Sequence, residues 1–352
     1  MIDLHAAGIA LTFDPTFGQL RDLVVTDGGH AVAPLHLAPW VGKETMPADA
    51  SPHLGALGGD FFCAPFGAQE GDSPLHGWPA NARWVVVAEA PGLVRAVLER
   101  PVFGATVVKE LTLRDGHPFV YQRHILVGGE GRLPVANHAN LALHNGALIR
   151  TSRKSHWETP GNALEPDPAR GRSALTYPAR AEDPTRFPGR DGPVDLTRYP
   201  FLDRHEEFVI GVEASGNALG WTGVTRAEGD LFLSLRDPAA LPMTMLWHSN
   251  GGRDYAPWSS RHTGCLGVEE GAAVPLLGVS TEADLSGPGA LTLGPGGTAE
   301  VRHVLGAIRW PADEPLAEVR PAADSLTLVG EAGTTREVPF WGPFLAPSQP
   351  GA

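Results

Sequence analysis

The feature that most constrains the fold is a succession of short Val- and Leu-rich runs, interrupted about every ten residues by Pro, Gly or Asp-Gly turns. The succession is clearest over residues 82–129, which hold four or five such runs. The 43 glycines and 33 prolines supply many turns and leave few places for a long helix. This spacing is typical of antiparallel sheets packed face to face. We therefore predict an all-β fold, a large antiparallel β-sandwich.

The strand pattern stops over residues 151–200, a segment with eight prolines and no apolar run long enough for a core strand. A loop of this length inside a compact domain is usually functional or disordered. Its aromatic residues Trp157, Tyr177, Phe187 and Tyr199 favour a loop that packs on the protein. Because the same strand pattern resumes after the loop, we expect one domain over residues 1–352, with the Pro-rich loop as an insertion at about 151–200.

The charge and the apolar runs exclude several classes of partner. A formal net charge of −13 argues against nucleic acid, whose phosphates are bound by Lys and Arg. No apolar run approaches the roughly 18 residues of a membrane span, and the start of the chain lacks the pattern of a secretory signal. We expect a cytoplasmic monomer or homodimer that binds a small molecule and neither nucleic acid nor a membrane.

The two cysteines, Cys63 and Cys265, lie far apart in the sequence and cannot form a disulfide framework. We assign no zinc-binding spacing to either one and expect packed thiols, no metal and no cofactor.

Two segments combine an ionisable residue with strand alternation. In residues 136–143, His138 and Asn140 alternate with apolar side chains, which leaves His138 on the face away from the core. In residues 265–271, Glu269 shares a face with Gly267, so a ligand can approach over the glycine; Glu270 is expected to end the strand or turn into the next loop. A histidine and a carboxylate form a general acid–base set.

A third candidate is His76 in the segment LHGWPANARW, next to Gly77 and Pro79. On spacing alone, a histidine in such a turn is more often a surface residue than a catalytic one.

These three segments, in this order, resemble motifs of the galactose mutarotase-like superfamily, aldose 1-epimerase family. LHGWPANARW is similar to its His-Gly-Phe-Ala-Arg-Asn element, ANHANLAL to its Asn-His-Ser-Tyr-Phe-Asn-Leu element, and CLGVEEG to the strand with its catalytic Glu. The resemblance implies a sandwich with a concave sugar-binding face, and interconversion of the α and β anomers of a free sugar without a cofactor. It makes Glu269 the base, His138 the acid and His76 a sugar-binding residue.

The sequence departs from the family pattern near the sugar. Residues 58–74, just before the His-Gly element, contain no arginine, so that sugar contact is either missing or supplied by another residue such as Asp60 or Gln69. Arg83 falls close to the family's Arg-Asn pair. The Tyr-Phe of the second element is replaced by smaller residues. In the segment HSNGGRDYAPWSS we expect three residues to line the pocket, because aromatic faces stack on sugar C–H surfaces: Asp254, Tyr255 and Trp258.

Two other functions stay open. The missing arginine and the altered second motif are compatible with a carbohydrate-binding protein that lacks the chemistry. A hexose-6-phosphate epimerase would need a cationic cluster, to which Arg150, Arg153 and Lys154 could contribute.

Overall fold

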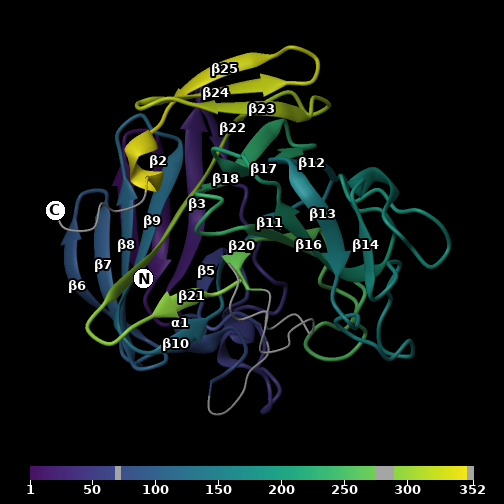
Figure 1. The fold of residues 1–352 in the computed structure, drawn as a ribbon, viewed down its shortest axis with the longest axis horizontal. Helices are drawn as coiled ribbons and strands as arrows, with labels where there is room; N and C mark the ends of the chain where they lie inside the picture. The colour runs from purple at the N-terminus through teal and green to yellow at the C-terminus, as the bar shows by residue number, and fades with distance from the viewer. Residues whose placement is uncertain (68–72, 274–288, 347–352) are drawn as a thin grey trace.

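The computed structural model describes residues 1–67, 73–273 and 289–346, and almost all of the regular structure in them is β-strand (Figure 1). Within these residues the larger sheet has eleven antiparallel strands. In spatial order they are β1 (Ile2–Ala6), β2 (Ile9–Asp14), β3 (Gln19–Asp27), β5 (Asp60–Cys63), β11 (Val135–Ala142), β20 (Cys265–Ala272), β19 (Met243–Asn250), β16 (His205–Glu213), β13 (Lys154–Thr159) and β14 (Ala179–Ala181), with β4 (His30–Val32) paired to β3.

A second sheet of nine strands, counted over the same residues, packs against the first. Its order is β15 (Arg198–Tyr199), β12 (Ala147–Thr151), β17 (Gly220–Arg226), β18 (Asp230–Arg236), β22 (Thr298–Arg309), β9 (Phe119–Gly128), β8 (Ala105–Leu113), β7 (Leu93–Leu98) and β6 (Trp84–Ala90). The predicted all-β antiparallel sandwich is confirmed. Alternate residues of each strand enter the core between the sheets, such as Leu11 and Val268 from the first and Val107 and Leu305 from the second.

Two smaller sheets complete the described β structure. The three strands β23 (Leu316–Pro321), β24 (Ser325–Gly330) and β25 (Thr335–Pro339) lie across one end of the sandwich, at the top of Figure 1. They share an apolar cluster with Tyr121 and Leu233 of the second sheet. The other small sheet pairs β10 (Gly131–Leu133) with β21 (Leu291–Leu293). The helical segments are short: η1 (Pro52–Ala56), α1 (Gly77–Asn81), η2 (Pro184–Arg186) and η5 (Gly342–Leu345).

The expectation of no core strand in residues 151–200 is wrong. The segment contributes β13 and β14 to an edge of the larger sheet and β15 to an edge of the second. The sequence does not indicate β13 because Lys154 and Glu158 interrupt its apolar pattern. Its Trp157 ring packs on Gly211 of β16, where a Cβ atom would lie 2.8 Å from the ring. Burial of Trp157, Phe187 and Tyr199 confirms that the segment packs on the protein.

The expectation that Glu270 ends a strand is also wrong, since β20 continues to Ala272. Glu270 points between the two sheets, where its Oε2 lies 2.7 Å from Arg236 Nη1 and accepts a hydrogen bond of 2.8 Å from Thr244. Both ions are fully buried. Alternation therefore sends Glu270 into a buried ion pair and Glu269 to the opposite face of the sheet.

Among the described residues, no helix is both long enough and apolar enough to cross a lipid bilayer.

Candidate functional site

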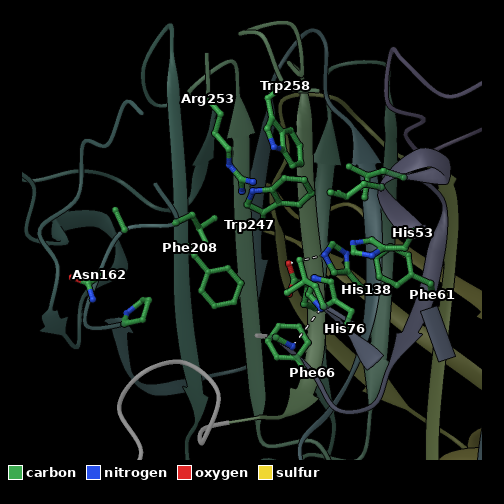
Figure 2. A pocket seen from close by; sticks show the side chains of 18 of the residues that line it. His53, Phe61, Phe66, His76, His138, Asn162, Phe208, Trp247, Arg253 and Trp258 are labelled. Carbon is green, nitrogen blue, oxygen red and sulfur yellow. Dashed lines mark hydrogen bonds and ion pairs between the residues drawn. The ribbon is translucent and has the colours of Figure 1, made fainter. Parts of the chain in front are cut away.

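The site is built on β11 and β20, two central strands of the larger sheet, where His138 and Glu269 stand directly opposite each other. His138 Nε2 lies 3.2 Å from Glu269 Oε1, the contact drawn as a dashed line in Figure 2. Both side chains lie on the face away from the sandwich core, as alternation predicted. They are nevertheless buried, because long connections between strands cover this face.

A glycine makes room for the pair. A Cβ atom at Gly267 would lie 2.9 Å from Glu269 Oε1 and 3.2 Å from His138 Cε1. The first contact is shorter than real Cβ atoms make and the second is tighter than most, so the side chains of the pair occupy space that the glycine leaves open. The predicted placement of Gly267 on the same face as Glu269 is confirmed.

The pair opens into a cavity of about 530 Å³, large enough for a small organic molecule. Its walls are mainly apolar and aromatic, with a few polar groups that converge from several elements (Figure 2). The lining residues are His53, Leu54, Leu57, Phe61, Phe66, Gly67, Leu75, His76, His138, Pro160, Gly161, Asn162, Ala163, Leu164, Phe208, Trp247, Arg253, Trp258 and Glu269. Residues 160–164 belong to the Pro-rich segment, so that segment forms one wall.

Burial favours the uncharged forms of the pair. It raises the pKa of the Glu269 carboxyl well above its usual range. It also lowers the pKa of His138 to about 3, with a smaller effect from nearby His53. Glu269 Oε2 and His138 Nδ1 are buried without a hydrogen-bond partner among the residues that the structure describes. These atoms can therefore accept or donate hydrogen bonds to a ligand.

Three rings hold the His138 imidazole. It stacks on Phe61 of β5, with ring centroids 4.6 Å apart, and meets Trp247 and His76 edge to face at 5.8 and 5.4 Å. The imidazole is thus fixed in orientation while its Nε2 faces Glu269.

His76 lines the cavity, which excludes its interpretation as a surface residue. It precedes α1 in a left-handed conformation with φ of 66°, and the next residue, Gly77, also has a positive φ of 73°. A Cβ atom at Gly77 would overlap the carbonyl oxygen of Ala64, so the glycine allows the turn to pack against β5. Burial lowers the pKa of His76 well below its usual value.

His53 is a cavity residue that the sequence did not indicate. Its Nδ1 lies 3.0 Å from Asn81 Oδ1, while the Asn81 amide nitrogen donates to the carbonyls of Leu75 and Gly77 at 2.7 Å. The amide orientation makes Asn81 Oδ1 an acceptor, so His53 Nδ1 carries the hydrogen and Nε2 is left as an acceptor. Burial lowers the pKa of His53 to about 4.

The segment HSNGGRDYAPWSS contributes Arg253 and Trp258 to the cavity rather than all three predicted residues. The Arg253 guanidinium lies 4.2 Å from the Trp258 ring centroid, and Nη2 pairs with Glu206 at 2.8 Å. Trp258 was predicted. Arg253 was not, because it lies in a loop, where the sequence does not indicate the direction of a side chain.

Other predicted binding residues lie outside the cavity. Arg83 is exposed and lies 3.9 Å from Glu99. Asp254 is exposed near Arg172, and the Tyr255 ring packs under the Arg170 guanidinium. These residues lie in loops, where strand alternation cannot fix a direction.

Of the two residues proposed to replace the missing arginine, Asp60 does not line the cavity. Asp60 points between the sheets and accepts a 2.8 Å hydrogen bond from Gln122, and burial raises its pKa to about 6. Its neighbour Phe61 takes the cavity face of β5 instead. Gln69 lies outside the described residues.

One group of possible metal ligands lies beside the cavity, in the part of the chain that the structure describes: His36, His262 and Cys265. His262 and Cys265 are three residues apart, so the expectation of no zinc-binding spacing is wrong for Cys265.

Solved structures with this fold were found by comparison. A galactose mutarotase-like protein from Lactobacillus casei superposes with a TM-score of 0.56 over 87% of this chain and 99% of its own, at 13% identity. The chain has the galactose mutarotase-like fold. A galactose mutarotase related enzyme from Lactobacillus acidophilus gives a TM-score of 0.53 at 11% identity, over 87% of this chain and 96% of its own. A putative aldose 1-epimerase from Escherichia coli K12 gives 0.51 at 13% identity, over 87% and 98%.

No family model matches the chain, and no curated protein matches it. This chain is therefore similar to galactose mutarotase-like proteins in the arrangement of its strands, that is in its fold, and not in its sequence.

Proposed function

We propose that this protein is an aldose 1-epimerase-like isomerase that interconverts the α and β anomers of a free sugar. The observation that carries the proposal is the contact of 3.2 Å between His138 Nε2 and Glu269 Oε1 inside a largely apolar cavity. An imidazole and a carboxylate at this distance can hold and exchange one proton, which is the chemistry that anomer exchange needs.

In the ring-opening step, Glu269 as a carboxylate takes the proton of the anomeric hydroxyl, and His138 as an imidazolium gives a proton to the ring oxygen. The bond between C1 and the ring oxygen breaks as C1 becomes an aldehyde. Rotation about the C1–C2 bond turns the other face of the aldehyde toward the ring hydroxyl. The reverse transfers then close the ring as the other anomer, so atoms and charges balance over the cycle.

The two protonation states of the pair differ only in the position of one proton. Before ring opening the pair is carboxylate and imidazolium; afterwards it is carboxylic acid and neutral imidazole. Burial favours the second form, since it raises the pKa of Glu269 and lowers that of His138. Before ring opening, transfer of the proton from Glu269 to His138 across the direct contact forms the charged pair, and hydrogen bonds from the sugar hydroxyls are expected to stabilise it.

The cavity walls suit a sugar. Aromatic rings of Phe61, Trp247 and Trp258 present flat apolar faces for sugar C–H groups, while His76 and Arg253 supply polar contacts. Arg150, Arg153 and Lys154 do not line this cavity, and Lys154 Nζ donates to Glu213 Oε1 at 2.5 Å. We therefore favour an unphosphorylated sugar over a hexose 6-phosphate.

The test is the rate of anomer exchange of freshly dissolved aldoses, followed by polarimetry and by NMR exchange spectroscopy. Glu269→Gln and His138→Gln are each expected to lower the rate by about 10²- to 10⁴-fold, the usual contribution of one acid–base group. Glu89→Gln, which changes an exposed carboxyl on β6, is the matched control. Full activity in Glu269→Gln would refute the proposal; sugar binding by calorimetry with no exchange would favour a binding protein.

A further inference from the structure

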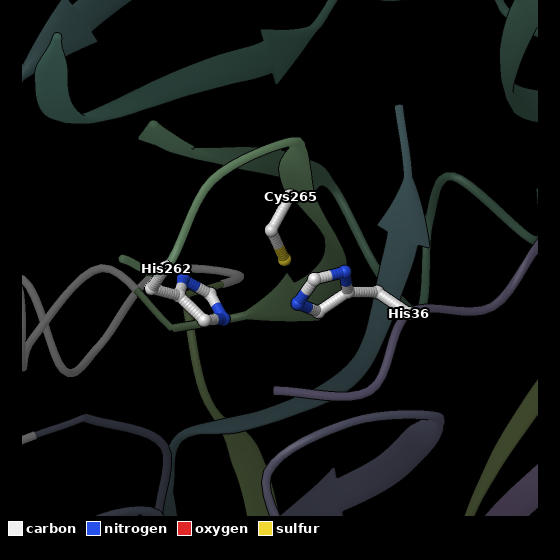
Figure 3. Close-up of side chains that lie close together, drawn as sticks. All are labelled: His36, His262 and Cys265. Atoms are coloured by element: carbon white, nitrogen blue, oxygen red, sulfur yellow. The ribbon is translucent and has the colours of Figure 1, made fainter. Parts of the chain in front are cut away.

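Three side chains capable of binding a transition metal meet on the same outer face of the larger sheet as the cavity. They are His36, His262 and Cys265, and their donor atoms lie within 4.8 Å of one another. In Figure 3 the Cys265 Sγ atom points into the space between the two imidazole rings. All three side chains are buried.

The donor atoms have no competing partners in the described protein. Among the buried atoms without a hydrogen-bond partner are His36 Nε2 and His262 Nε2. The Cys265 thiol is free of any disulfide.

A hydrogen-bonded chain behind His262 selects the tautomer that a metal requires. Ser249 Oγ donates to Glu206 Oε2 at 3.0 Å and lies 2.7 Å from His262 Nδ1. Because the single hydroxyl hydrogen goes to the carboxylate, Ser249 Oγ accepts from His262 Nδ1. His262 Nε2 therefore presents a lone pair toward Cys265. In protein metal sites, the second ring nitrogen of a histidine ligand commonly donates a hydrogen bond to a group that orients the ring, often a carboxylate.

Strand pairing and backbone hydrogen bonds hold each of the three ligand residues in place. Cys265 lies in β20, paired with Ala142 of β11 and Ser249 of β19. The backbone of His36 is bonded on both sides, to Asn140 O at 2.8 Å and to Gly59 N at 2.9 Å. The His262 carbonyl accepts from Gly251 N at 2.7 Å. Tetrahedral zinc places such donors roughly 3.5 Å apart, so small side-chain rotations would fill three of its four positions and leave the fourth to a water molecule.

We propose that His36, His262 and Cys265 form a three-ligand metal site for zinc or a similar soft divalent cation. Two imidazoles and one thiolate are ligands that zinc prefers, and the cysteine sulfur disfavours magnesium and calcium. The thiol proton leaves when the ion binds. This inference stands on its own donor set and does not depend on the proposed epimerase activity.

The site would stabilise one wall of the cavity. The His262 ring stacks on Trp247 at 5.3 Å and meets Trp258 edge to face at 5.2 Å. Glu206, which ends the hydrogen-bonded chain, also accepts from Trp247 Nε1 at 2.5 Å and pairs with Arg253. A bound ion would therefore hold in place the imidazole on which both tryptophans pack.

The decisive experiment uses the full chain without a histidine tag, treated with a chelator and then titrated with Co²⁺ or Zn²⁺ alone. We expect one ion per chain, a thiolate-to-cobalt charge-transfer absorption that Zn²⁺ abolishes, and a thermal midpoint that rises with zinc concentration. Absence of the thiolate absorption in the wild-type protein would overturn the proposal without any variant.

Variants assign the ligands. Cys265→Ser should abolish the absorption, whereas Cys63→Ser, a matched change at the other buried thiol, should keep it. Ser249→Ala should weaken zinc affinity by about 10- to 100-fold through the outer shell. An unchanged cobalt spectrum in Cys265→Ser, or its loss in Cys63→Ser, would assign the metal elsewhere and refute this site.

Discussion

Gly267 and Glu269 share one face of β20 so closely that a Cβ atom on the glycine would lie 2.9 Å from the carboxylate oxygen Oε1. The same atom would lie 3.0 Å from Trp247 Cβ. Neither the strand backbone nor the packed tryptophan can move away freely, so the Glu269 side chain is the group that must shift.

Gly267→Ala is therefore expected to lower the anomer-exchange rate by about 10²-fold, because a shift near 1 Å of a catalytic group has effects of that size. The rate is measured by polarimetry and the fold by circular dichroism. Gly294→Ala is the control, since a Cβ atom at Gly294 meets nothing within 4 Å. Equal rates in the two variants would show that Glu269 need not keep its position.

Glu269→Gln is expected to become more stable relative to the wild type as pH rises. The raised pKa means that the folded protein keeps a proton that the unfolded chain releases above pH 4.5. The wild type therefore loses stability as pH rises through this range, by about 1.4 kcal/mol per pH unit while the folded carboxyl stays protonated. Glutamine has no proton to release.

Urea denaturation of the wild type and Glu269→Gln at several pH values measures this difference. The buried neutral His138 is common to both proteins, so its own pH effect largely cancels. The difference in stability between Glu89→Gln, which changes an exposed carboxyl, and the wild type should not change with pH. A stability gap between Glu269→Gln and the wild type that does not widen above pH 4.5 would mean that Glu269 is ionised in the folded protein.

Arg236→Met is expected to destabilise the protein strongly, although Arg236 touches no part of the cavity. Its guanidinium pairs with Glu270 at 2.7 Å and with Glu213, and it is fully buried. Removing one partner of a buried pair costs about 3–5 kcal/mol, because the other charge stays buried and unpaired.

The double variant Arg236→Met with Glu270→Gln should recover part of that free energy, measured by urea denaturation. Arg320→Met is the contrast, since Arg320 and Glu318 form an exposed pair whose loss should change stability little. A double variant no more stable than Arg236→Met would mean that Glu213, rather than Glu270, carries the penalty.

Sequence reasoning succeeded where side-chain direction follows from strand alternation. That period placed His138 and Glu269 on one face, and the antiparallel register of β11 and β20 then set them opposite each other. It failed at Glu270 because the identity of a partner on the second sheet, here Arg236, is not a local property.

The cavity walls could be predicted only in part because loops supply many of them. His53 and Arg253 stand in loop or 3-10 segments, where direction depends on turns such as the left-handed residue at His76. The buried charge of Lys154 in β13 is equally hard to predict, since its partner Glu213 lies 59 residues away.

Arg253→Met is expected to raise KM by about tenfold or more while changing kcat less, because the side chain lines the cavity but lies apart from the His138–Glu269 pair. Methionine keeps most of the apolar stem that packs on Trp258 and removes the charge. Loss of the partner of Glu206 also lowers stability, so the thermal midpoint is measured in parallel. Arg83→Met, the exposed arginine that the family resemblance indicated, should leave KM unchanged. The opposite result, with KM raised in Arg83→Met and not in Arg253→Met, would place the sugar outside the cavity described above.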